Sequence, residues 1–252
     1  MQVLFSIRIF SALSMIMFHN HMFFRRHPSL FRSCFLPCSR SAALLQFFMR
    51  TREGGPVMLL WTVQPESALE EIEQNGVFRC DAAQSFNLTK KDSLKIPYEW
   101  MIRQMQKRIG PAAAGVSYPV WAWHTWEFER QCPDTDSAAF LKRTEDKVLF
   151  TLDIPKNAVL LSDFDAWQFV LNDSYVSCVS TEEEWNAQDT WLDSLEDDAF
   201  EAAVHASWEN VFLLDPIDSP YLTRGRFIQA TFWELKREYI QDTHILKAVP
   251  SR

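Results

Sequence analysis

The sequence predicts an α+β fold: a single compact domain with a mixed, mostly antiparallel sheet and flanking helices. Short strand-like runs and amphipathic helical segments follow one another without the regular βαβ order of a doubly wound sheet. The chain of 252 residues is 47% hydrophobic, which is enough to form a sizeable core. All ten tryptophans lie beyond Met58, so the predicted domain covers residues 58–252.

Charge divides the chain at the same place. Residues 1–57 contain seven arginines and one acid, Glu53, which is a net charge of +6. Subtraction from the whole chain leaves 18 basic and 32 acidic residues for 58–252, a net charge of −14. An abrupt change of composition marks a domain boundary. The basic leader, residues 1–57, is therefore predicted to be disordered or foreign to the native protein.

Three interpretations of the leader stay open. Its Arg-rich, acid-poor composition resembles a transit peptide, and the apolar residues 9–18 resemble a short signal-peptide region. That apolar run is too short to span a bilayer. In the third interpretation translation naturally begins at Met58, where the strand-like MLLWTV starts.

The five cysteines do not form a disulfide framework. Cys34 and Cys38 lie in the leader, and the other three are far apart in the sequence: Cys80, Cys132 and Cys178. This pattern predicts a reduced, cytoplasmic protein. No second cysteine pair at zinc spacing accompanies Cys34 and Cys38, so no metal site is expected.

The main domain begins with a strand and a helix. Residues 58–64 are an apolar run that ends in polar residues, which indicates a strand. Pro65 suits the first turn of a helix, and Gly76 ends that helix. Residues 77–80 are predicted to be extended.

A second helix and a tryptophan-rich strand follow. Residues 97–109 carry an apolar stripe at helical spacing and end at Gly110. The next segment, YPVWAWHTW, predicts a strand with Trp121 and Trp123 on one face. Both faces of this strand contain large apolar side chains, so both are expected to be buried.

The middle of the chain predicts further strands before another helix. In residues 148–154 every second residue is a large apolar one, and the residues between them vary in polarity, which indicates a strand that ends at Pro155. Residues 158–161 are a second, shorter strand candidate. Ser162 is the expected N-cap of a helix with a stripe of large apolar residues.

The last third of the chain predicts an acidic helical region and then strands. Thr181 and Glu184 form a capping box, and the many acids of residues 182–201 indicate a solvated helix face. Three further segments are strand candidates: 211–214, 226–236 and 244–249. The segment 244–249 is a candidate partner of 226–236.

Common catalytic motifs are missing. The sequence has no phosphate loop, GxGxxG, HExxH, GxSxG or paired CxxC. His124, between two tryptophans, is better explained as a hydrogen-bonded core or rim histidine than as a catalytic base, and His205 in an alanine-rich helix is a weaker candidate. Cys80 follows Arg79, but no nearby residue in the sequence supports an activated thiol. Asp163 and Asp165 could form a catalytic carboxylate pair. However, acids at a helix N-terminus stabilise the helix, and this explains both residues without catalysis.

Four blocks of sequence resemble an uncharacterised bacterial domain family of unknown function. They span almost all of residues 58–252: LWTVQPESALEEIEQNGVFRCD, YEWMIRQMQKRIG with YPVWAWHTW, VLLSDFDAWQFVLN and IQATFWELK. Members of that family begin near the LWTVQ motif, which supports the view that residues 1–57 are extra. The resemblance implies no established activity.

The opening strand, helix and glycine turn are more distantly similar to ADP-ribosyltransferase-like folds. That resemblance implies an enzyme that uses NAD, with Glu234 as the catalytic acid that orients the ribose. It implies cofactor binding by residues near the first and last major strands: Trp61, Thr62, Gln64, Arg79 and Gln229. Two features depart from the pattern, because strand alternation places Gln229 and Glu234 on opposite faces and no Ser-Thr-Ser-like motif is present.

The alternative is a noncatalytic module that binds a protein or a small ligand through its tryptophan-rich surface or its acidic helix. Whether the protein is an enzyme therefore stays open. The net charge of −14 for residues 58–252 argues against binding of duplex nucleic acid, and no membrane association of these residues is expected.

Overall fold

The computed structural model describes residues 51–52, 55–80, 94–137 and 145–249. The chain divides into two compact units. One consists of Thr51–Pro133 and Arg143–Arg252, and the other of Met1–Arg50 and Asp134–Lys142. Most of the second unit, with Cys34 and Cys38 of the leader, lies outside the described residues. Every helix and strand within the described residues belongs to the first unit.

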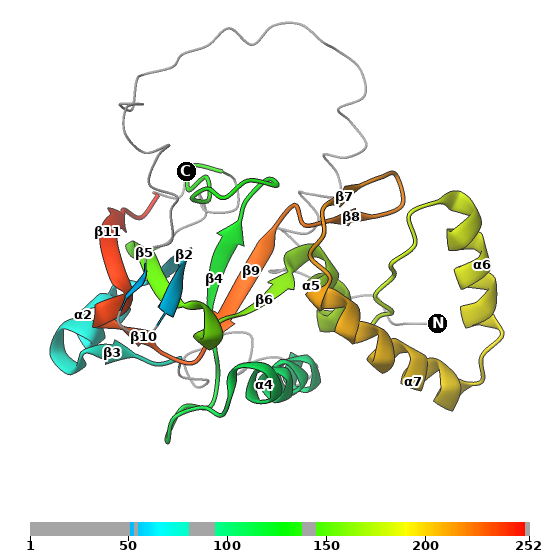
Figure 1. Cartoon of the computed structure of the whole chain (residues 1–252), viewed down its shortest axis with the longest axis horizontal. Helices are drawn as coiled ribbons and strands as arrows, with labels where there is room; N and C mark the ends of the chain where they lie inside the picture. Colours follow the sequence, from blue (N-terminus) through cyan, green and yellow to red (C-terminus); the bar gives the residue numbers. More distant parts are fainter. Residues whose placement is uncertain (1–50, 53–54, 81–93, 138–144, 250–252) are drawn as a thin grey trace, which may run out of the picture. The chain divides into compact units, whose positions relative to one another are not determined.

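An antiparallel sheet forms the centre of this unit (Figure 1). Its strands lie in the order β11-β5-β2-β4-β9-β6, and β1 pairs with the start of β2. The strands of the sheet are β1 (Thr51–Arg52), β2 (Gly55–Pro65), β4 (Val120–Thr125), β5 (Lys147–Pro155), β6 (Leu160–Asp163), β9 (Ile228–Phe232) and β11 (Ile240–Leu246). Two short ribbons pair β3 (Val77–Phe78) with β10 (Leu235–Lys236) and β7 (Ile217–Asp218) with β8 (Thr223–Arg224).

Helices connect and cover these strands. The α-helices of the described residues are α2 (Glu66–Asn75), α4 (Lys95–Ile109), α5 (Phe164–Leu171), α6 (Glu182–Asp193) and α7 (Asp197–Ser207). The 3-10 helices are η4 (Lys156–Ala158), η5 (Trp208–Phe212) and η6 (Arg237–Tyr239). The predicted α+β class is confirmed. None of the helices in the described ranges combines the length and the apolar character that crossing a bilayer requires.

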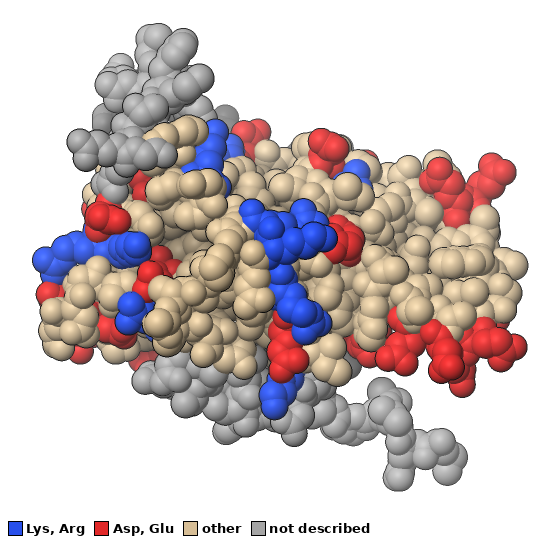
Figure 2. All heavy atoms as spheres, turned by 60° about the horizontal axis from the view of Figure 1, so that its bottom comes forward, with Lys and Arg blue, Asp and Glu red and all other residues tan. Residues whose placement is uncertain are grey.

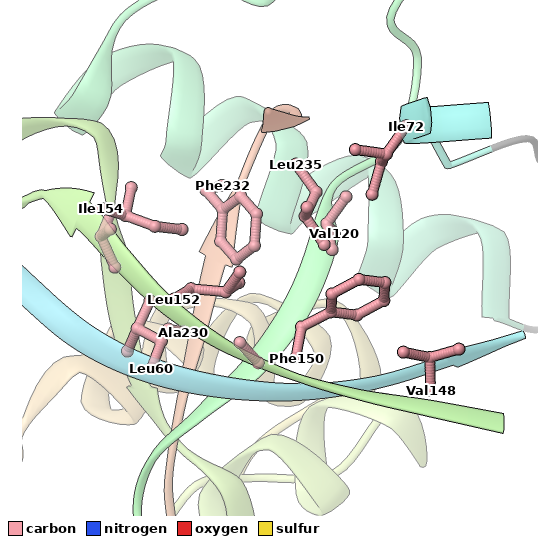
Figure 3. Close-up of a cluster of buried hydrophobic side chains, with 12 residues drawn as sticks. Leu60, Ile72, Val120, Val148, Phe150, Leu152, Ile154, Ala230, Phe232 and Leu235 are labelled. Carbon is pink, nitrogen blue, oxygen red and sulfur yellow. The ribbon is translucent and has the colours of Figure 1, made fainter. Parts of the chain in front are cut away.

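One core lies between the sheet and α2. Leu60 of β2 pairs with Leu152 of β5, so alternate residues of these strands point to the same face. Figure 3 shows Phe150 and Leu152 close to Phe232 of β9. All of these side chains are at most 1% exposed, which makes this cluster the apolar centre of the sheet.

A second core lies on the opposite face. Leu160 of β6 and the partly buried Trp121 of β4 belong to one apolar cluster with side chains from α4, α5, α7 and η5. The members from these helices are Trp100, Met101, Met105, Trp167, Val170, Val204, Trp208 and Val211. The prediction that both faces of the tryptophan-rich strand are buried is only partly met, because Val120 and Ala122 are buried whereas Trp121 and Trp123 are partly exposed.

Several predicted boundaries are confirmed. Helix α2 follows Pro65 and ends at Gly76, which has a φ of 77° and donates its N–H to Ile72 O at 2.9 Å. Helix α4 ends at Gly110, and β5 ends at Pro155. Local sequence is sufficient here because these ends depend on residues that break or cap an element.

Two predicted starts are displaced. Strand β2 begins at Gly55 and not at Met58, because Val57 continues the ladder by pairing with Pro155. The N-cap of α5 is Asp163 and not Ser162, since Asp163 Oδ1 accepts the N–H of Ala166 and Ser162 still belongs to β6.

The predicted strands near the C-terminus need three corrections. Residues 208–212 are the 3-10 helix η5, because Trp208 and Val211, three residues apart, both face the second core. The long strand 226–236 is broken into β9 and β10, which pair in different sheets. The last strand is Ile240–Leu246, and its partner is β5 rather than β9.

Candidate functional site

The predicted cofactor residues on β2 make internal contacts. Trp61 is 7% exposed and Thr62 is 2% exposed. Thr62 Oγ1 donates to Trp121 O at 2.7 Å, and Gln64 Nε2 donates to Thr62 Oγ1 at 2.7 Å. The polar groups of Thr62 and Gln64 therefore hold β2 against β4.

Gln229 lies on the same face of the sheet as Trp61. Trp61 pairs with Trp123, and Trp123 pairs with Gln229. The Gln229 side chain is buried and donates from Nε2 to Ser162 Oγ at 3.2 Å. Thr62 adjoins Trp61 in the strand, so it points to the opposite face. The structure thus brings Trp61 and Gln229 to one face and separates them from Thr62.

Arg79 and Glu234 form an ion pair away from that face. Arg79 directly follows β3, and Glu234 directly precedes β10, so the pairing of these strands brings the two residues together. Arg79 Nη2 lies 2.7 Å and Nε 2.8 Å from Glu234 Oε1. The Glu234 side chain is 12% exposed. The proposed catalytic acid is therefore engaged by a cation of its own chain.

Asp163 connects two segments that are far apart in the sequence. Its Oδ1 accepts the N–H of Ala166 at 2.8 Å, and its Oδ2 accepts the N–H of Gly225 at 2.7 Å. Gly225 has a φ of 77°, and a Cβ there would lie 2.9 Å from Leu214 O. Burial raises the pKa of Asp163, although its hydrogen bonds with the backbone oppose that rise. Its role is to fasten α5 to the loop before β9.

Asp165 is the second carboxylate of this pair. Burial, with smaller contributions from Asp163 and Glu127, raises the pKa of Asp165 to about 7, and Arg226 opposes the rise. A carboxyl group that titrates near neutral pH can exchange protons there. Helix N-terminal stabilisation, which the sequence suggested for both acids, thus explains Asp163 better than Asp165.

Replacement of Asp165 by Asn is expected to change how stability depends on pH. The pKa of Asp165 in the folded protein lies above that of an unfolded Asp, about 4. The folded state therefore binds the extra proton between about pH 4 and 7, and its stability falls as pH rises through this window. Three pKa units at about 1.4 kcal/mol each mean that Asp165→Asn should be more stable than wild type by up to about 4 kcal/mol at pH 8 and equal to it near pH 4.

Urea denaturation of both proteins at the two pH values measures this difference. The exposed Asp218→Asn is the matched control and should keep the wild-type profile. An Asp165→Asn profile parallel to that of wild type would contradict the raised pKa of Asp165.

A strained turn follows β4. Trp126 and Glu129 exchange backbone hydrogen bonds of 2.9 and 3.1 Å across it. The two central residues, Glu127 and Phe128, have φ angles of 52° and 63°, which are unfavourable for residues other than glycine. Arg226 holds the turn through two bonds to the Glu127 carboxylate, at 2.7 and 2.9 Å.

This turn reverses the chain and brings Arg130 back to the sheet. No motif in the sequence predicted this position of Arg130. Arg130 Nη2 donates to Leu59 O at 2.6 Å, and its guanidinium lies 5.7 Å from the centre of the Trp61 ring. Burial lowers the pKa of nearby His124 to about 3, and the cations Arg130 and Lys156 add to that effect. The His124 ring is therefore neutral and a poor general base at neutral pH.

Three aromatic side chains on α6 and α7 are more than 40% exposed. We call residues 181–207, which comprise both helices, the acidic arm. It contains nine acids and no lysine or arginine. Figure 1 shows α6 and α7 at the β6 side of the sheet, and Figure 2 shows acidic side chains gathered at that end of the molecule. The predicted capping box begins this arm, with Thr181 Oγ1 accepting the N–H of Glu184 at 3.3 Å.

Helix α6 has no buried residue. Helix α6 contacts the segment before it through several side chains. Ser177 Oγ donates to Gln188 Oε1 at 3.0 Å, the Ser180 N–H donates to Glu184 Oε2 at 3.0 Å, and the Trp191 ring lies 6.0 Å from that of Tyr175. Trp185 and Trp191 are nevertheless 41% and 45% exposed. The acids predicted a solvated helix, and this explains the charges of α6. It does not explain why two large indole rings are left only partly covered.

Helix α7 adds a further aromatic ring and a shallow hollow. Phe200 is 44% exposed. The hollow has a volume of about 350 Å³ and is lined by Asp198, Glu201, Ala202 and His205. Its acidic lining suits a positively charged group. The signal that sequence reasoning missed was the presence of Trp185, Trp191 and Phe200 within such an acidic region.

Comparison with known proteins gives a family. The family model described as Domain of unknown function (DUF3841) matches residues 59–241. This span includes the acidic arm, the Asp163 and Asp165 pair and every residue predicted to bind NAD. No curated protein and no solved structure matches the chain.

Proposed function

We propose that this chain, which belongs to the DUF3841 family of domains of unknown function, is a noncatalytic protein-binding module whose partner docks on the acidic arm. The cytoplasmic location that its cysteine pattern indicates is part of this proposal. The rest of the domain then acts as a rigid base, because its two cores hold the segment from which α6 and α7 extend.

One observation carries the proposal. Helix α6 buries none of its residues, yet it exposes more than two fifths of both Trp185 and Trp191. A helix of this length is only marginally stable by itself in water. Each indole that a partner covers would contribute about 2 kcal/mol of apolar burial. Exposed aromatic residues are the usual anchors of protein interfaces.

The residues predicted to bind NAD support this choice over catalysis. Thr62, Gln64 and Gln229 use their polar atoms in internal hydrogen bonds, and Glu234 is paired with Arg79. These residues are distributed over both faces of the sheet and a separate ribbon, as expected if their roles are structural. An NAD-using activity stays a prediction, and it would require Glu234 to exchange Arg79 for a ribose.

Site-specific photocrosslinking in the source cells tests the module. We expect benzoylphenylalanine in place of Trp185 or Phe200 to form adducts with the same partner protein, because both positions would face it. Ile96 is the matched control position, since it is 57% exposed but lies on α4. Adducts from position 200 should disappear when Trp185→Ala is added, because that change removes an exposed anchor and keeps the contact between Trp191 and Tyr175.

The opposite pattern would contradict the proposal. If Ile96 gave the same adducts as the arm, or if the arm positions gave none, the exposed rings of α6 and α7 would not be a docking surface.

A further inference from the structure

We propose that the partner of the acidic arm is a cationic, amphipathic protein segment, and that one of its Arg or Lys side chains enters the hollow on α7. This inference rests on the proposed function and adds the chemistry of the partner. It combines the apolar exposure of the arm with its charge and with the shape of α7.

Charge is the first argument. The nine acids of the arm have no lysine or arginine among residues 181–207 to compensate them. Asp189 and Asp193 are four residues apart on α6, and Asp197 and Glu201 are four apart on α7, so like charges adjoin along both helices. Such pairs destabilise a helix, and a cationic partner would relieve the repulsion.

The hollow on α7 is the second argument. Asp198, Glu201, Ala202 and His205 recur at helical spacing and line a depression of about 350 Å³. The carboxylates of Asp198 and Glu201 provide acceptors for a guanidinium or an ammonium group. His205 Nε2 lies 3.2 Å from Asp173 Oδ1, so the contact with Asp173 anchors the ring that forms one wall of the hollow.

The exposed rings supply the apolar half of the recognition. Trp185, Trp191 and Phe200 are each more than 40% exposed on the same pair of helices. Indole rings bind aliphatic side chains and also attract cations to their faces. In an amphipathic segment, apolar and basic side chains alternate at helical spacing. Its apolar side chains would pack against the exposed rings while its basic ones pair with the carboxylates.

Charge also weighs against other occupants. A second copy of the chain would bring another acidic arm, and an anionic membrane surface or a nucleic acid would be repelled. The leader of this chain is cationic, with seven arginines in residues 1–57, so the experiment must distinguish it from a partner protein.

Calorimetric titration of the full chain tests the proposal. The probe is a synthetic helical peptide in which Arg and Leu recur at helical spacing, and the comparison peptide has Glu in place of each Arg. We expect the Arg peptide to bind and the Glu peptide not to bind. High salt should weaken the Arg complex because its charges are partly exposed.

Two double variants locate the contact. Asp198→Asn with Glu201→Gln should raise the Kd of the Arg peptide about tenfold, since it removes the charges of the hollow but keeps its shape. Glu70→Gln with Glu73→Gln removes the same charge from exposed positions of α2 and should leave the Kd within about twofold.

Three outcomes would overturn the cationic partner. Equal binding of the Glu peptide, or an unchanged Kd for the α7 variant, would show that charge does not select the partner. The third is much tighter binding by a chain whose leader arginines are replaced by glutamine, which would make the leader the occupant. The first two outcomes would leave the photocrosslinking of the arm to a partner unchanged. The binding module and the cationic chemistry of its partner are therefore tested independently.

Discussion

Replacement of Trp208 by Ala is expected to lower the free energy of unfolding by about 3–5 kcal/mol. Trp208 is 1% exposed, and its ring lies 5.6 Å from Trp100 of α4 and 4.6 Å from His205 of α7. Its Nε1 donates to Ser174 O at 3.3 Å. The change would leave a cavity where the acidic arm joins the second core, so hydrogen exchange of α7 should also accelerate. Urea denaturation measures the first effect and amide exchange the second.

Trp191→Ala is the matched control for this prediction. It removes an indole of the same size, but one that is 45% exposed, so it should change the stability by less than about 0.5 kcal/mol. Similar losses for the two variants would mean that Trp208 does not anchor the arm, or that α6 contributes more to the fold than its exposure indicates.

The second large effect is expected for Asp163→Ala, which should cost about 3 kcal/mol. The carboxylate is fully buried and accepts the N–H groups of Ala166 and Gly225 on its two oxygens. Alanine would leave both donors without a partner, and each buried donor of this kind costs about 1–3 kcal/mol. Asp163→Asn should cost less because one acceptor oxygen remains. Thermal and urea unfolding compare the three proteins.

An exposed helix cap provides the reference. Thr181 caps α6 in the same way that Asp163 caps α5, but its surroundings are open to water. Thr181→Ala should therefore cost about 1 kcal/mol or less. If Asp163→Ala were as mild as Thr181→Ala, the bond to Gly225 would not be needed to hold α5 against the loop before β9.

Helix boundaries were the most predictable part of the fold. Pro65 and Gly76 delimit α2, and the Thr181 and Glu184 capping box begins α6, because caps and breakers act within a few residues. The errors lie among the strands. Residues 211–214 have strand-like composition, yet their first residues belong to a 3-10 helix because Trp208 and Val211 must both reach one core.

Strand partners could not be derived from local pattern. The segment that contains β9 and β10 reads as one strand, but Trp233 Nε1 donates to Gly110 O at 3.0 Å in the break between them. Contacts of this kind join residues more than a hundred positions apart. The pairing of β11 with β5, instead of with β9, has the same origin.

The candidate site shows a similar division. Trp61 and Gln229 share a face only because β4 lies between their strands, and Arg130 reaches Leu59 only because the strained turn at Glu127 reverses the chain. The acids of the arm were evident in the sequence. The exposure of Trp185 and Trp191 was not, since an apolar residue in a helix is normally buried.

The sequence by itself determined the α+β class, the acidic character of the domain after the leader and the ends of its first helices. These depend on composition and on signals a few residues long, which act in the same way in any fold. Tertiary structure alone decided the strand order, the raised pKa of Asp165 and the unburied face of α6. Burial and exposure are set by segments distant in the chain, so no local pattern contains them.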